Sequence, residues 1–68
     1  MVYTTADLEL ANRHVLLGEK HIIDQEMLIT KLMAKGLDTA VAESLLSLFV
    51  DMLNIHRDRR DRIAATLH

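Results

Sequence analysis

The stretch Lys35-Gly36-Leu37-Asp38-Thr39 separates two long segments in which apolar residues recur every three to four positions. Glycine adopts the left-handed backbone conformation at little cost, so Gly36 directly after such a segment is typical of a helix end. Asp38 is a good N-cap, because its carboxylate accepts hydrogen bonds from the free N–H groups of a following helix. One helix ends and another begins within about three residues, which predicts an antiparallel helical hairpin.

This all-α hairpin is expected to occupy residues 1–68 as a single domain. We expect the first helix over about residues 5–35, a turn at residues 36–38 and the second helix over about residues 39–66. Thr4, followed three residues later by Asp7, resembles the capping box that opens many helices. A chain of 68 residues leaves no room for a second domain.

Each expected helix carries a broad apolar face. In the first helix this face follows a regular three–four spacing and consists of Leu8, Ala11, Val15, Gly18, Ile22, Gln25, Ile29 and Leu32. In the second helix it is expected to consist of Val41, Ala42, Leu45, Leu46, Leu48, Phe49, Met52, Leu53 and Ile55, and to resume at Ile63 and Leu67. A hairpin folded about Leu37 pairs residues whose numbers sum to about 74, so Gly18 would face His56.

The apolar faces are wider than two helices can cover, and we expect a second copy to cover the rest. Two hairpins would then form a homodimeric four-helix bundle. The residues expected in the dimer interface are Leu16, Ile23, Leu46, Phe49 and Leu53. Self-association also suits a chain without cysteine, because small domains without disulfides bury too little surface to be stable alone.

Six short stretches carry a resemblance to known proteins. They are Arg13-His14-Val15, Gly18-Glu19-Lys20, Asp24-Gln25-Glu26, Gly36-Leu37-Asp38-Thr39-Ala40, Ala42-Glu43-Ser44-Leu45-Leu46 and His56-Arg57-Asp58-Arg59-Arg60. With these stretches, residues 11–63 resemble a group of short bacterial helical-hairpin proteins that has no assigned function. The resemblance implies a hairpin and implies no catalytic or ligand-binding residues.

Polar residues near the apolar faces are the candidate site. Glu19, His56 and Arg59 are expected to form a hydrogen-bonded polar layer that sets the helix register, or alternatively a pocket for an anion or small ligand. The four histidines also suggest a metal, but none of their pairs has i,i+4 spacing. His14 and His21 lie about 10 Å apart along one helix. We therefore expect neither a metal nor a cofactor.

Arginines gather near the end of the second helix, at Arg57, Arg59, Arg60 and Arg62. The interleaved Asp58 and Asp61 can pair with arginines one turn away, so a solvated, salt-bridged helix end is the preferred interpretation. The alternative is a contact to phosphate or nucleic acid through these arginines. The net charge of −2 and only two aromatic residues make nucleic acid the less favoured partner.

No catalytic constellation is recognisable, since no serine stands at a readable spacing from a histidine and an acid. The sequence also shows neither a signal peptide nor the roughly 18 apolar residues that span a bilayer, which favours the cytoplasm. We therefore expect a non-enzymatic protein-interaction or assembly module that acts as a homodimeric bundle, with a further unidentified protein partner left open. The alternative function is a nucleic-acid-binding hairpin dimer that uses the arginine cluster.

Overall fold

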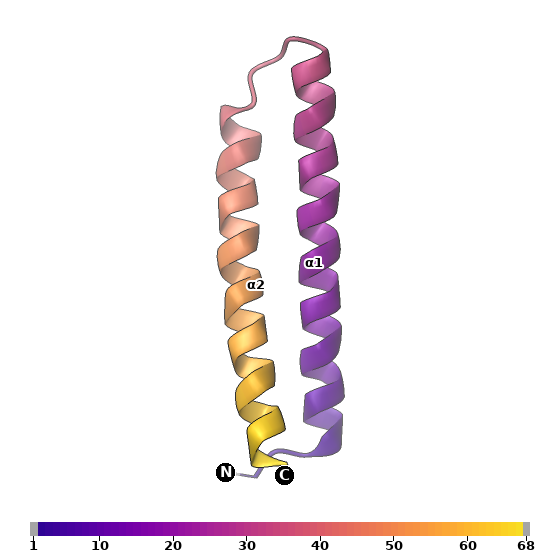
Figure 1. The fold of residues 1–68 in the computed structure, drawn as a ribbon, viewed down its shortest axis with the longest axis vertical. Coiled ribbons are helices and arrows are strands. Elements are labelled where there is room, and N and C mark those ends of the chain that lie inside the picture. The colour runs from indigo at the N-terminus through magenta and orange to yellow at the C-terminus, as the bar shows by residue number, and fades with distance from the viewer. Residues whose placement is uncertain (1, 68) are drawn as a thin grey trace.

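The computed structural model describes residues 2–67 and contains two helices, α1 (Thr5–Ala34) and α2 (Ala40–Thr66). The helices run antiparallel, so that the start of α1 and the end of α2 lie at the same end of a long rod (Figure 1). The Cα atoms extend over 51 × 15 × 13 Å. The all-α hairpin is confirmed, and each helix boundary lies within one residue of the predicted one. Neither helix, over the described residues, has the length and apolar character needed to cross a membrane.

α1 begins with a capping box. The hydroxyl oxygen of Thr4 accepts a hydrogen bond from the backbone N–H of Asp7 at 3.2 Å. In return, the Asp7 carboxylate accepts one from the backbone N–H of Thr4 at 2.8 Å. The predicted capping box is therefore confirmed, with aspartate in the position that glutamate or glutamine usually occupies.

α1 ends in a Schellman motif around Gly36, which has a φ of +69°. The N–H of Leu37 donates to the carbonyl of Leu32 at 2.9 Å, and the N–H of Gly36 donates to the carbonyl of Met33 at 3.0 Å. These bonds satisfy carbonyl groups that the end of a helix would otherwise leave free. The predicted glycine stop is confirmed.

The cap of α2 differs slightly from the predicted one. Thr39 is the N-cap residue, and its side chain makes no capping hydrogen bond. The carboxylate of Asp38 accepts a hydrogen bond from the N–H of Ala40 at 2.9 Å. Asp38 thus satisfies a free N–H of α2, as expected, but from one position before the N-cap.

The helices meet along a continuous seam of buried and half-buried residues. On α1 the seam consists of the eight residues predicted from the three–four spacing, Leu8, Ala11, Val15, Gly18, Ile22, Gln25, Ile29 and Leu32. On α2 it consists of Ala42, Leu46, Phe49, Leu53, His56, Arg60 and Ile63. The predicted face of α1 is confirmed, whereas the buried part of α2 is narrower than expected. It leaves exposed Val41, Leu45, Leu48, Met52 and Ile55.

The register of the hairpin differs from the predicted one by about one helical turn. A Cβ atom placed on Gly18 would lie 3.6 Å from Cβ of Leu53, and not against His56. His56 instead faces His14, with 5.2 Å between the ring centroids. The numbers of these facing residues sum to 71 and 70, where the sequence predicts about 74.

The path of the turn explains this shift. The predicted register assumes that the chain crosses directly at Leu37, but residues 37–39 run back along α1 before α2 begins. The end of α1 therefore extends beyond the start of α2 (Figure 1). Near this end, the side-chain amide of Gln25 donates to the backbone carbonyl of Ala42 at 2.8 Å, which ties the two helices together in the observed register.

An engineered cysteine pair tests the register, because the chain has no cysteine of its own. In Gly18→Cys/Leu53→Cys, the Cβ separation of 3.6 Å suits a disulfide, so we expect mild oxidation to cross-link each chain to itself. Gly18→Cys/His56→Cys, the pair that the predicted register brings together, is the matched control and should stay without an internal cross-link. Mass spectrometry measures both, and internal cross-linking of the control pair alone would contradict the observed register.

Replacing Gly36 tests the turn. No atom outside the adjacent residues lies within 4 Å of an added Cβ, so Gly36→Ala changes only the backbone energy at a φ of +69°. We expect the free energy of unfolding to fall by about 1 kcal/mol in urea titrations. Lys35→Ala is the control, because Lys35 is exposed and has a φ of −90°. Equal stability of the two variants would argue against the left-handed turn.

Candidate functional site

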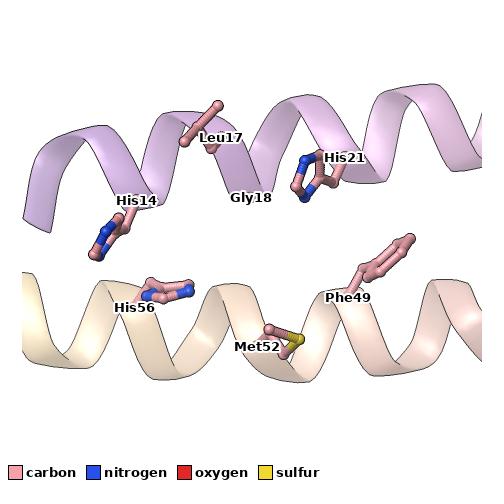
Figure 2. Close-up of a pocket in the computed structure, with 7 residues that line it drawn as sticks. All are labelled: His14, Leu17, Gly18, His21, Phe49, Met52 and His56. Carbon is pink, nitrogen blue, oxygen red and sulfur yellow. The ribbon is translucent and has the colours of Figure 1, made fainter.

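A shallow apolar groove of about 300 Å³ lies between the helices on one flank of the hairpin. Both helices contribute to it, and three histidines stand around it (Figure 2). The residues that line it are His14, Leu17, Gly18 and His21 from α1, and Phe49, Met52 and His56 from α2. Its lining is mostly apolar and comes from both helices, and it is therefore the candidate site.

Exposed apolar side chains also lie on both sides of this groove along the hairpin, with charged side chains among them. Towards the start of α1, Leu10 lines a small depression together with His14 and Arg59. Towards the turn, helical spacings of three and four residues extend the same side. We call this surface the histidine flank, formed by Leu10, His14, Leu17, His21 and Leu28 of α1 and Val41, Leu45, Leu48, Met52, Ile55 and Arg59 of α2. The same spacing also places on it the charged side chains of Asp24, Lys31 and Arg62.

The opposite flank of the hairpin is more polar. Helical spacing places on it Asn12, Leu16, Glu19, Ile23 and Glu26 of α1 and Glu43, Ser47, Val50, Asn54 and Arg57 of α2. Its apolar residues are separated by charged and amide side chains. The two flanks of the hairpin therefore differ in chemical character, and the histidine flank is the apolar one.

The five residues predicted for a dimer interface do not share one surface. Leu53 is only 4% exposed because it packs between the helices, and the expectation that a single hairpin leaves it uncovered is wrong. Leu46 and Phe49 are half-buried on the seam. Leu16 and Ile23 are exposed, as expected, but they lie on the more polar flank. The three–four seam of α2 runs through Leu46 and Leu53. The prediction is wrong because the apolar arc in the sequence is wide, and nothing in it separates the residues of the buried seam from those at the edges.

The residues predicted to form a polar layer are not brought together. His56 and Arg59 lie on or beside the histidine flank, whereas Glu19 is half-buried on the opposite one. Over residues 2–67, no hydrogen bond or ion pair joins the three side chains. The polar contact between the helices is instead the one from Gln25 to the Ala42 carbonyl. The three–four spacing correctly predicts that Gln25 lies on the seam, but it carries no information about a backbone partner.

The predicted arginine cluster is spread around α2. Arg60 is half-buried on the seam and pairs with Asp61 at 3.0 Å. Arg62 is exposed and pairs with Asp58 at 2.9 Å. The other two members of the cluster, Arg57 and Arg59, lie on opposite flanks. The four arginines therefore do not form one continuous basic surface.

The three histidines of the groove make two cross-helix contacts that the sequence did not predict. The rings of His14 and His56 face each other, with their planes inclined by 53° (Figure 2). The ring of His21 lies 5.9 Å from that of Phe49, centroid to centroid. Both contacts follow from the shifted register. Within the part of the chain that the structure describes, no three side chains of histidine, aspartate or glutamate converge as metal ligands.

We compared the chain with protein-family models, with curated proteins and with solved structures, and none of them matches it. The resemblance to short bacterial hairpin proteins therefore stays a prediction. What the protein does has to be inferred from its own residues, of which the histidine flank is the most distinctive group.

Proposed function

We propose that the protein is a non-catalytic assembly module that pairs with a second copy of itself through the histidine flank. Two hairpins joined in this way form a four-helix bundle. The observation that supports this proposal is the apolar groove on one flank, together with the exposed apolar side chains that α1 and α2 leave uncovered beside it. An apolar surface of this kind is costly in water and is typical of an interface.

The total exposed surface also favours a second copy as the occupant. The hairpin exposes 5255 Å², whereas the scaling of surface with mass gives about 4,300 Å² for a compact chain of this size. The excess of about 900 Å² is close to the ~800 Å² that each partner contributes to a standard protein interface. Two rods that pack along their length would remove such an excess from both copies at once.

The apolar character of the flank supplies the driving force. Leu17 and Met52 stand on either side of the groove and are each 53% exposed in the single hairpin. Burial of about 1,600 Å² in total contributes on the order of tens of kcal/mol before the entropic cost of association. Leu48 and Ile55, more exposed still, would be covered with them.

A pair of neighbouring substitutions tests which flank pairs. We expect the wild-type chain to sediment as a dimer at micromolar concentration. Leu17→Glu should raise the dissociation constant at least 100-fold, roughly 3 kcal/mol, because it buries a carboxylate in the interface. Leu16→Glu is the matched control, since Leu16 is exposed on the opposite flank, and it should leave the dimer intact.

Sedimentation equilibrium measures the oligomeric state of both variants, and circular dichroism shows whether each is folded. A monomeric wild-type chain that stays folded would contradict the proposal. Dissociation by Leu16→Glu, with Leu17→Glu unaffected, would assign the interface to the more polar flank. If Leu17→Glu unfolds, the concentration dependence of wild-type unfolding decides the question, because the stability of a dimer rises with concentration and that of a monomer does not.

The alternative function, nucleic-acid binding through the arginines, has less support. Arg60 and Arg62 are paired with aspartates, and the four arginines point to different sides of α2. Filter binding of double-stranded RNA at low salt tests it, with Arg59→Glu/Arg60→Glu as the comparison. We expect weak binding that the substitution hardly changes. Tight, salt-dependent binding that the substitution abolishes would favour the alternative.

A further inference from the structure

We propose that His14 and His56 together bind a divalent transition-metal ion such as Zn²⁺, with one ring from each helix as a ligand. The site requires only a single hairpin and does not depend on the proposed pairing of two copies. The register predicted from the sequence sets His56 opposite Gly18, one helical turn away from His14. The observed register brings the centroids of the two rings to within 5.2 Å of each other.

The separation of the rings suits a shared ion. Zinc binds imidazole nitrogen at about 2.0–2.1 Å with tetrahedral angles. Because each nitrogen lies about 1.2 Å from the centre of its ring, two imidazoles on one ion place their ring centroids about 5.2 Å apart. The centroids of His14 and His56 are 5.2 Å apart, and their planes are inclined by 53°, so the rings are not stacked. The proposed site requires one nitrogen of each ring to be directed at a common point between the helices.

The surroundings leave room for the ion and its remaining ligands. Both rings are half-buried and border the groove of about 300 Å³, so water can complete the coordination. Over residues 2–67, no hydrogen bond from the protein engages either ring. The adjoining depression on the other side of His14 is lined by Asp7 and Arg59, whose carboxylate and guanidinium have opposite charges. One helical turn beyond His56, the guanidinium of Arg60 pairs with the Asp61 carboxylate at 3.0 Å, so both arginines near the rings have an acidic neighbour.

The chemistry of the two ligands determines the class of ion. Neutral imidazole suits zinc, copper and nickel, whereas magnesium and calcium prefer oxygen ligands. His21 also borders the groove, but seven residues separate it from His14, about 10 Å along the helix, so it cannot reach the same ion. His21 is therefore an internal control. An ion held by one ligand from each helix links α1 to α2 and stabilises the folded hairpin.

Thermal unfolding of the full chain with ZnCl₂ or MgCl₂ tests the site, in a His68→Ala background that removes the fourth histidine. We expect Zn²⁺ to raise the midpoint of unfolding by several degrees and Mg²⁺ to leave it unchanged. The zinc effect should disappear in His14→Ala and in His56→Ala and persist in His21→Ala. Isothermal titration should give one Zn²⁺ per hairpin, with affinity at least tenfold weaker in the first two variants.

Two results would overturn the site. One is an unchanged midpoint at millimolar Zn²⁺, and the other is a zinc effect that survives both His14→Ala and His56→Ala. If either variant fails to fold, NMR of the unsubstituted chain decides instead. Substoichiometric Cu²⁺ should broaden the ring signals of His14 and His56 before those of His21, and equal broadening of all three would contradict the site.

Discussion

The way in which the chain leaves α1 determines every contact between the helices. The left-handed Gly36 and its two backbone hydrogen bonds stop α1, and residues 37–39 then run back along it. If α2 began one residue earlier or later at the same place, each of its side chains would shift by about 1.5 Å along the helix axis and about 100° around it. Leu53 would then lose its place against Gly18, and His56 its place opposite His14. The seam, the groove and the histidine pair therefore all depend on a short turn with fixed hydrogen bonds.

The packing of the seam also explains why so much apolar surface stays exposed to solvent. Small residues at Ala11, Gly18 and Ala42 let the helices approach closely, and Gly18 lies so near Leu53 that an added Cβ would be 3.0 Å from one of its methyl groups. Two helices in contact bury only the row of side chains that each directs at the other, so the core is thin. Leu48 and Ile55 lie outside the row on α2 and stay exposed. A thin core and a broad apolar flank are two consequences of the same packing, and both favour a second copy.

Local chemistry made most of the fold predictable. The capping box at Thr4, the glycine stop at Gly36 and the spacing on α1 depend on residues near one another in sequence, so the helix bounds and one buried face could be inferred. The register could not, because it depends on the path of residues 37–39 and on packing between residues far apart in the sequence, such as Gly18 against Leu53. The apolar arc of α2 is likewise wider than its buried seam, so the sequence predicts an exposed Leu53, which the structure buries. The contact between His14 and His56 follows from the register alone, so the sequence could not predict it.

The two proposals concern one surface, and so they are thermodynamically linked. A metal ion bound between His14 and His56 would keep open coordination positions towards the groove, on the flank that a second copy is proposed to cover. If the second copy supplied nitrogen ligands from its own histidines, the ion would strengthen pairing. If it supplied only apolar groups, covering the ion would remove its water and weaken pairing. By reciprocity, whatever factor zinc applies to the pairing constant, pairing applies to the affinity for zinc. The sign of that coupling therefore reports whether histidines or leucines of the second copy face the ion.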